Sequence, residues 1–328
     1  MIARSVLGRT GIEVSLLGLG GVFLASDSAS ELDVKSAVDG ALKAGVNYID
    51  TAPMYGDSEA VLGRVLDGRN EPLIMSTKLG GRPSPFDPRD VRALRGSFDE
   101  SLRLLGRDYI DILFIHEPDR PGEYDWWTDR KDLRGPVLDV VRTLKDEGRI
   151  GHVGLGGTTA YEIVDLIETD IFDVVLTAFN YSLLWREAER YLIPAAASRG
   201  IGVVIGSPLQ QGALSRRYDL DSDRLRWLSP PRREQLRALY GFADRAGIPI
   251  PELALRFVIS NPAVHCVLTG ARSPAEVSSS VAAVNRGPLD DASLAELDDI
   301  AAMVPLRPFE EPSSLPLGSD YRGPGPMR

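Results

Sequence analysis

Short apolar runs alternate with longer amphipathic stretches along the whole chain, and this pattern is the strongest constraint on its fold. We expect strands at 15–19, 46–49, 73–77, 110–115, 152–155, 174–178, 202–205 and 265–268. We expect helices at 30–44, 58–66, 87–105, 136–147, 160–167, 187–198, 252–259 and 274–284. Strands that are apolar on both faces predict a parallel sheet covered by helices. Eight such units in one array favour a closed (β/α)8 barrel, a TIM barrel of the α/β class, over an open doubly wound sheet.

Three segments interrupt the repeat. Residues 1–14 carry the turn Gly8-Arg9-Thr10-Gly11 between two short strands, which predicts a β-hairpin across the floor of the barrel. Residues 117–135 follow the fourth strand, and residues 210–230 follow the seventh. Long loops after barrel strands lie on the C-terminal face, where the active sites of this fold lie.

The length of the chain is compatible with one barrel. At about 150 residues per domain, 328 residues suggest two domains, but barrels routinely form one domain of about 200–250 residues or more. We therefore expect a single domain over residues 1–328, with a Pro-, Gly- and Ser-rich irregular tail at 305–328.

Charge and composition exclude several classes of function. The 37 Lys and Arg residues against 47 Asp and Glu give a net charge of −10, which disfavours binding to nucleic acid. No apolar run approaches the roughly 18 residues that span a bilayer, and the first residues do not show the charged-then-apolar pattern of a secretion signal. Cys266 is the one cysteine, and His116, His152 and His265 are the only histidines, so we expect neither a disulfide nor a metal site. These features favour a reducing, cytoplasmic location without a membrane partner.

Ionisable residues stand at the C-terminal ends of three successive expected strands. Asp50 ends the second strand, Lys78 the third and His116 the fourth, and a tight turn after Asp50 presents Tyr55. These strand ends meet at one mouth of a barrel, where polar residues are more often catalytic than structural. Each residue alone also has a structural interpretation, as an ion pair, a half-buried aromatic ring or a hydrogen-bonded histidine. Their joint spacing favours catalysis.

The four residues support proton exchange at an oxygen atom. A phenol has a pKa near 10, and we expect the Lys78 ammonium to lower the pKa of Tyr55 while Asp50 fixes Lys78. A histidine orients a carbonyl oxygen. Interconversion of a carbonyl and an alcohol then needs a hydride carrier, which implies a nicotinamide cofactor. Cys266 lies in the eighth strand, away from the four, and His152 and His265 fall inside strands, where we expect structural roles.

The motif Asp-Thr-Ala-x-x-Tyr-Gly-x-Ser-Glu at 50–59, with Thr77-Lys78 and Ile115-His116 at two later strand ends, resembles the aldo-keto reductase superfamily. The resemblance covers nearly the whole chain, through the glycine-containing segments 18–21, 148–154 and 270–274. It implies an NAD(P)-dependent oxidoreductase in which Tyr55 is the general acid/base. It also implies that Lys78 tunes Tyr55, that Asp50 holds Lys78, and that His116 orients the substrate oxygen.

The resemblance further implies a set of cofactor contacts around the mouth. The turn after the first strand would line the nicotinamide end, the loop after the seventh strand would cover the pyrophosphate, and the last helix N-terminus would hold the adenosine phosphate. A plain tight turn is the alternative for the first of these. The implied cofactor residues are Gly20, Gly21, Val22, Asp50, Asn180, Gly206, Ser207, Pro208, Leu209, Gln211, Gly212, Gly270, Arg272, Ser273, Glu276 and Ser280.

Several positions depart from the family pattern. Gly206 stands where many members have an aromatic residue that stacks on nicotinamide. Gly156-Gly157 replace a Ser-Asn pair that holds the carboxamide, and Asn180 lies near the place of a usual glutamine. These departures resemble the sugar- and pyridoxal-oxidising branch of the superfamily more than the aldose-reductase branch.

Glu276 bears on the choice between the two nicotinamide cofactors. It falls where the family often has an Arg or Gln that binds the 2′-phosphate of NADP. A carboxylate repels a phosphate but accepts a hydrogen bond from a ribose hydroxyl. We therefore expect NAD or NADP, with NAD favoured. The alternative role of Glu276 is to complement the dipole of its helix.

Trp126, Trp127 and Trp185 lie on or near loops that face the mouth, and they predict an aromatic wall for the substrate. Packing is the alternative role for these rings. The favoured substrate is an aldose, a lactol or another polyhydroxy carbonyl compound. Two alternatives stay open: a general NADPH-dependent reductase of aldehydes and ketones, and a nicotinamide-binding regulatory subunit. A monomer and a homo-oligomer both stay open as well.

Overall fold

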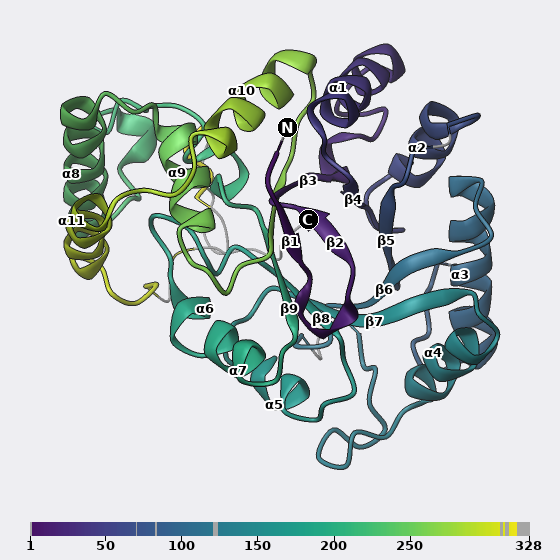
Figure 1. Cartoon of the computed structure of the whole chain (residues 1–328). Coiled ribbons are helices and arrows are strands. Elements are labelled where there is room, and N and C mark those ends of the chain that lie inside the picture. Colours follow the sequence, from purple (N-terminus) through teal and green to yellow (C-terminus); the bar gives the residue numbers. More distant parts are fainter. Residues whose placement is uncertain are drawn as a thin grey trace.

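The structure is a computed structural model that describes residues 2–69, 71–82, 84–120, 124–308, 311 and 315–319. Eight parallel strands form a closed barrel in the order β10-β3-β4-β5-β6-β7-β8-β9, and Figure 1 shows helices arranged around them. The predicted TIM barrel is therefore confirmed. The barrel strands are β3 Leu17–Gly20, β4 Tyr48–Asp50, β5 Ile74–Leu79, β6 Ile110–His116, β7 Ile150–Gly157, β8 Val174–Ala178, β9 Gly202–Gly206 and β10 Cys266–Thr269.

Most of the helices lie where the apolar periodicity predicts them. Helix α1 shows why: Ser30 caps its first turn by accepting a hydrogen bond from the Asp33 amide, and Gly45 ends it in a left-handed conformation. The helices are α1 Glu31–Ala44, α2 Ser58–Leu66, α3 Val91–Leu105, α4 Pro136–Asp146, α5 Val164–Ile167, α6 Glu187–Arg190, α7 Leu192–Ser198, α8 Pro230–Ala246, α9 Ile250–Ile259, α10 Pro274–Asn285 and α11 Asp291–Ala302.

Two features of the helix prediction are wrong. It omits α8 and α11, and it joins α6 and α7 into one helix. Pro230 and Pro231 occupy the first turn of α8, where a missing N–H is tolerated, instead of ending a loop. Pro194 has no N–H to donate to the carbonyl of Arg190, so the helix is interrupted at Tyr191.

The N-terminal segment closes the floor of the barrel, as predicted. β1 (Arg4–Val6) and β2 (Glu13–Ser15) pair antiparallel, and Figure 1 shows this hairpin in purple over the barrel strands. The guanidinium of Arg9 donates to the carbonyls of Asp170 and Phe172 at 2.8 and 2.9 Å. His265, at this end of the barrel, accepts a hydrogen bond from the Val203 amide.

Apolar side chains fill the barrel from this floor upward. One cluster lies inside the barrel, and a larger cluster lies between the strands and the surrounding helices. Because the interior is packed, the open end is the C-terminal mouth. The interior cluster consists of Leu7, Val14, Tyr48, Ile112, Phe114, Val174, Leu176, Val204, Cys266 and Leu268.

Of the expected irregular tail, residues 305–308, 311 and 315–319 are described and form neither helix nor strand, and its other positions lie outside the described residues. Within the described ranges, no helix is both long and apolar enough to cross a membrane.

Candidate active site

The ends of three neighbouring strands deliver charged residues to the mouth. β4 ends in Asp50, β6 ends in His116, and Lys78 is the penultimate residue of β5. In the parallel ladders Asp50 lies opposite Ser76, and Lys78 lies opposite Phe114. The structure thus brings together residues that are far apart in the sequence.

Lys78 is held in a buried ion pair. Its Nζ donates to Asp50 Oδ2 at 2.6 Å and to the Thr51 carbonyl at 2.8 Å. Only 1% of the Lys78 side chain and 3% of the Asp50 side chain are exposed. Burial lowers the pKa of Lys78, but the charges of Asp50 and Tyr55 outweigh burial and leave that pKa raised. Lys78 is therefore a cation at neutral pH.

Ser76 and Tyr48 extend this pair, and the sequence analysis missed their role. The Ser76 hydroxyl donates to Asp50 Oδ1 at 2.7 Å and lies 2.9 Å from the Tyr48 hydroxyl. A serine hydroxyl carries one proton, so Tyr48 donates to Ser76 when Ser76 donates to Asp50. The sequence did contain a signal for this role. Tyr48 stands two residues before Asp50, and Ser76 two residues before Lys78, so each pair lies on one face of its strand.

Tyr55 lies half-buried on the loop after β4, with its ring centroid 4.7 Å from Lys78 Nζ. Burial raises the pKa of the Tyr55 phenol above its ordinary value of 10.0, and the lowering effect of Lys78 is smaller. Lys78 does lower this pKa as expected, but the expected net lowering is wrong, because burial, with a smaller contribution from the charge of Asp50, outweighs the effect of Lys78. At neutral pH Tyr55 is a protonated phenol that can donate its proton.

His116 completes the group as a neutral imidazole. Burial lowers its pKa well below the ordinary 6.5, and the charges of Lys78 and Arg120 lower that pKa further. The ring stands edge-on to the Tyr55 ring, with centroids 6.0 Å apart. Its Nδ1 is buried and has no hydrogen-bond partner among the described residues. Trp126 Nε1 fixes the backbone at this point by donating to the His116 carbonyl at 2.9 Å.

The other half of the mouth carries almost no side chains. A Cβ added to Gly156 would lie 3.6 Å from Phe114 Cβ and 3.7 Å from Lys78 Cδ, so no neighbour requires a glycine there. The small residues on this side of the mouth are Gly20, Ala178 and Gly206 at the ends of β3, β8 and β9, and Gly156, the penultimate residue of β7. These small residues leave backbone surface beside Lys78 against which a flat ring can pack, so the residues present fit a nicotinamide ring. The adjoining Gly21 and Val22 form a 3-10 turn after β3.

The loops after β8 and β9 contain strained backbone. Phe179 has a φ of 68°, and Ser207, Gln210 and Gln211 have φ of 54°, 49° and 50°. Left-handed conformations cost non-glycine residues about 1–3 kcal/mol each, so surrounding contacts must hold them. Gln210, which the sequence analysis passed over, supplies such a contact by donating to the Phe179 carbonyl at 3.0 Å. The implied pyrophosphate residues Ser207, Pro208, Leu209, Gln211 and Gly212 all lie in the loop after β9.

The N-terminus of α10 gathers the residues expected at the adenosine end. Ser273 caps the helix by accepting a hydrogen bond from the Glu276 amide. The Glu276 carboxylate accepts a hydrogen bond from the Arg272 amide at 2.7 Å and lies 3.6 Å from the Arg272 guanidinium. Gly270 precedes this turn and packs against the Phe23 ring.

Asn180 and Ser280 are hydrogen-bonded to residues at the ends of β8 and β10. Both side chains are buried. The Asn180 amide donates to Thr177 Oγ1 and to the Ala178 carbonyl, each at 3.0 Å. The Ser280 hydroxyl lies 3.0 Å from Thr269 Oγ1. In this structure both residues are bonded within the protein.

The structure does not gather the three tryptophans into one exposed wall. Trp126, Trp127 and Trp185 are 0%, 6% and 2% exposed, because all three pack into the larger core cluster. Tyr124 and Phe86 are half-buried beside the mouth and lie edge-on to each other, with ring centroids 5.6 Å apart. A Cβ on Gly80 would lie 3.4 Å from the Tyr124 ring and 3.5 Å from His116 Cβ, which places Tyr124 next to the charged residues.

These features define a class of protein: a (β/α)8-barrel enzyme whose mouth holds a protonated phenol, a buried cation and a neutral imidazole beside strand ends that carry small residues. Residues 16–302 match the family model described as the aldo/keto reductase family. The chain belongs to the aldo/keto reductase family and is an NAD(P)-dependent oxidoreductase.

Individual relatives place it more finely. L-galactose dehydrogenase of Arabidopsis thaliana is 30% identical over 96% of this chain and 98% of that protein. Pyridoxal 4-dehydrogenase of Microbacterium luteolum is 29% identical over 85% of this chain and 92% of that protein. The solved holo form of an aldo-keto reductase from Bacillus halodurans has a TM-score of 0.77 and 27% identity over 92% of this chain and 97% of that one. The expected similarity to the sugar- and pyridoxal-dehydrogenase branch is confirmed.

Proposed function

We propose that this enzyme interconverts a carbonyl compound and the corresponding alcohol, or a sugar lactone and the corresponding lactol, and that Tyr55 is its general acid/base. The observation that carries the proposal is the packing of the Tyr55 ring against the Lys78 ammonium, 4.7 Å away, beside the ring of His116. A bound nicotinamide cofactor supplies or accepts the hydride.

Each side chain has a distinct task in this reaction. Tyr55, a protonated phenol, donates its proton to the substrate oxygen during reduction and takes it back during oxidation. Lys78 stabilises the phenolate that remains, and Asp50 keeps Lys78 in place. His116 is neutral, so it can donate a hydrogen bond to the substrate oxygen without competing for the proton.

We propose a polyhydroxy carbonyl compound, an aldose or a lactol, as the substrate class. The half-buried rings of Tyr124 and Phe86 support this choice, because an aromatic ring suits the apolar face of a sugar. The relatives named for L-galactose and pyridoxal support a cyclic, hydroxyl-bearing substrate.

We propose NAD as the preferred cofactor. The backbone surface at Gly20, Gly156 and Gly206 receives the nicotinamide ring, and the N-terminus of α10 receives the adenosine end. There the only cation of the turn, Arg272, already lies beside the Glu276 carboxylate, which a 2′-phosphate would have to approach. We also propose that the barrel is the single domain of the chain, since both core clusters belong to it.

Two assays test the function. The absorbance of reduced nicotinamide is followed with NAD and a panel of aldoses, and with NADPH and apolar aromatic aldehydes. Turnover of sugars with NAD supports the proposal, and turnover restricted to apolar aldehydes with NADPH supports a general reductase. Tight cofactor binding without turnover of any carbonyl or alcohol supports a regulatory subunit.

A pair of variants tests the mechanism. Tyr55→Phe lowers kcat by about 10²–10⁴-fold, the usual contribution of a positioned acid, while cofactor affinity is unchanged. Tyr161→Phe is the control, because Tyr161 is exposed and stacks on Tyr191. Unchanged turnover in Tyr55→Phe contradicts the assigned role.

A further inference from the structure

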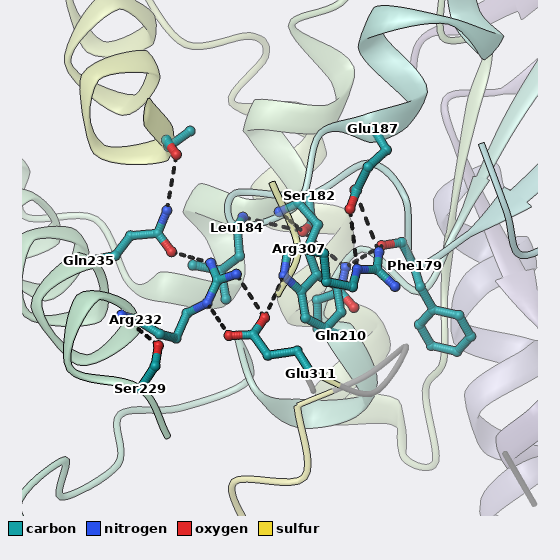
Figure 2. A network of polar contacts seen from close by, with 12 residues as sticks. Phe179, Ser182, Leu184, Glu187, Gln210, Ser229, Arg232, Gln235, Arg307 and Glu311 are labelled. Carbon is teal, nitrogen blue, oxygen red and sulfur yellow. Dashed lines mark hydrogen bonds and ion pairs between the residues drawn. The ribbon is translucent and has the colours of Figure 1, made fainter. Parts of the chain in front are cut away.

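A stretch of the C-terminal tail joins the loops after β8 and β9, which carry implied cofactor residues such as Asn180, Ser207 and Gln211. We call the described residues 305–308 and 311 the C-terminal strap. Figure 2 shows its two polar side chains, Arg307 and Glu311, among residues of the loops after β8 and β9 and of helix α8. The contacts bridge more than a hundred positions of sequence, since Arg307 meets Phe179 at a separation of 128.

Arg307 holds the loop after β8. Its guanidinium donates to the Phe179 carbonyl at 3.1 Å and to Asn180 Oδ1 at 3.4 Å, and it forms an ion pair with Glu187 at 3.2 Å. The same guanidinium lies 4.0 Å from the ring centroid of Trp185. Four residues of one loop and its following helix are thus fixed by one side chain.

The Phe179 carbonyl is the junction between the loops. It accepts hydrogen bonds from Arg307 of the strap and from Gln210 of the loop after β9, at 3.1 and 3.0 Å. Phe179, Gln210 and the neighbouring Gln211 all have left-handed backbone conformations. Such conformations persist only where contacts over-determine them. The donors on this carbonyl therefore hold both loops in their strained shapes.

Glu311 anchors the strap to the barrel. Its carboxylate accepts hydrogen bonds from both Nε and one terminal nitrogen of Arg232 at 2.8 Å, and from Trp185 Nε1 at 3.2 Å. The Arg232 and Glu311 side chains are 0% and 6% exposed. Gln235 accepts a further hydrogen bond from Arg232 and donates to the Ile300 carbonyl. An ion pair this deeply buried and bidentate makes the strap a fixed part of the barrel.

We propose that Arg307 is a positioning residue that preorganises the loops after β8 and β9 for the dinucleotide. The inference rests on the proposed function, because it takes these loops to be the cofactor site. Arg307 does not contact the reacting atoms in this arrangement. It acts through the Phe179 carbonyl and Asn180, and it lowers the conformational cost of closing the loops on the cofactor.

The test is the affinity for NADH in three variants of the full-length protein. Arg307→Ala raises the Kd by about tenfold, whereas kcat at saturating NADH and the KM of the carbonyl substrate stay near the wild-type values. Arg307→Lys keeps the charge but lacks the planar guanidinium, so its Kd for NADH lies between those of the wild type and Arg307→Ala. Arg9→Ala is the matched control: Arg9 also donates to two backbone carbonyls and pairs with acids, but on the barrel floor.

Hydrogen exchange of backbone amides distinguishes a local loosening of the two loops from a loss of stability of the whole protein. In Arg307→Ala, the backbone amides at 179–185 and 207–213 exchange faster, while those of the barrel strands do not. If Arg307→Ala does not fold, the intermediate Kd of Arg307→Lys carries the test.

Other outcomes overturn the proposal. An unchanged NADH Kd in both Arg307 variants overturns the positioning role and leaves the oxidoreductase assignment intact. An equal loss of affinity in Arg9→Ala shows a general effect of stability and also overturns it. A wild-type protein that binds neither NADH nor NADPH overturns the proposed cofactor site itself, together with this inference.

Discussion

The ammonium of Lys78 lies 2.6 Å from Oδ2 of Asp50, and both side chains are almost completely removed from water. The charges stabilise each other where neither is solvated, so the loss of one partner leaves the other buried and unpaired. The same pair sets the electrostatic surroundings of Tyr55 and His116. Stability and the proposed catalysis are therefore coupled at this point of the barrel.

Asp50→Asn tests this coupling. The substitution leaves Lys78 as an unpaired buried cation, so we expect the free energy of unfolding to fall by about 3–5 kcal/mol. Urea denaturation measures the loss. Asp223→Asn is the control, because Asp223 pairs with Arg226 at 2.7 Å with both side chains more than three-quarters exposed, and we expect a change below about 1 kcal/mol. Equal losses in the two variants contradict the assignment of a buried, desolvated pair.

The pH dependence of reduction follows from two shifted pKa values. Burial raises the pKa of Tyr55 above 10.0, and burial with nearby positive charge lowers the pKa of His116 well below 6.5. The phenol must be protonated to donate, so a raised pKa moves the loss of activity to higher pH. We expect kcat/KM for reduction to stay level from about pH 7 to about pH 9 and to fall only above about pH 10. A break near pH 6.5 that disappears in His116→Gln contradicts a neutral imidazole.

The eight barrel strands and the gathering of Asp50, Lys78 and His116 could be predicted because they depend on periodicity and chain order alone. Residues at the C-terminal ends of successive parallel strands meet at one edge whatever their loops do. The hydrogen bond from Ser76 to Asp50 could have been predicted in the same way, because alternate strand residues share a face and Ser76 lies opposite Asp50 in the neighbouring strand.

The rest depends on tertiary contacts that no local pattern encodes. Helix α8 escaped prediction because its buried face includes two polar residues, Arg232 and Gln235, whose partners are distant in sequence: Glu311 of the tail for Arg232 and the Ile300 carbonyl for Gln235. The net pKa of Tyr55 required the balance between burial and Lys78. The burial of Trp126 required the rings of Phe86 and Tyr124, which approach it from separate segments.

The backbone surface at Gly156 predicts a variant that loses cofactor but keeps its fold. A Cβ at this position meets only ordinary contacts, so we expect Gly156→Leu to fold with the rest of its side chain in the proposed space of the nicotinamide ring. We expect at least a roughly tenfold rise in the NADH Kd.

Gly157→Ala is the matched control, for which we expect a loss of stability instead of a loss of cofactor affinity. Its Cβ would lie 2.5 Å from Ile163 Cδ1 and 2.9 Å from Asp119 Oδ2, which costs about 1–3 kcal/mol. Fluorescence titration and thermal unfolding measure the two effects. A wild-type Kd for NADH in Gly156→Leu rules out Gly156 as the place where the nicotinamide ring packs.

Glu276 predicts a change in cofactor preference. Removing its charge in Glu276→Gln frees the Arg272 guanidinium, 3.6 Å away, for a 2′-phosphate. We expect the ratio of NADPH to NADH affinity to rise by about tenfold. Separate titrations with NADH and NADPH measure the ratio, and Asp291→Asn, another first-turn acid, is the control. A wild-type preference for NADPH of a hundredfold, about 2.7 kcal/mol, overturns the interpretation of Glu276.

Asp173 predicts how stability changes in acid. Burial raises the pKa of this carboxyl, but hydrogen bonds from His152 and the Val153 amide, with the charges of Lys145 and His152, outweigh burial and bring the pKa to about 2. Because the folded-state pKa lies below the unfolded value, the stabilisation is complete above the unfolded pKa and is lost as the pH falls toward 2.

Asp173→Asn therefore destabilises the protein by about 1–2 kcal/mol at pH 7, after allowance for solvent screening, and by about half as much near pH 3. Urea denaturation of the wild type and the variant at the two pH values measures this difference. Asp139→Asn removes an exposed carboxylate that pairs with Arg142 at 3.0 Å, and it should show a small effect at both pH values. A penalty for Asp173→Asn that is as large at pH 3 as at pH 7 shows that packing, and not the charge of Asp173, secures the barrel floor.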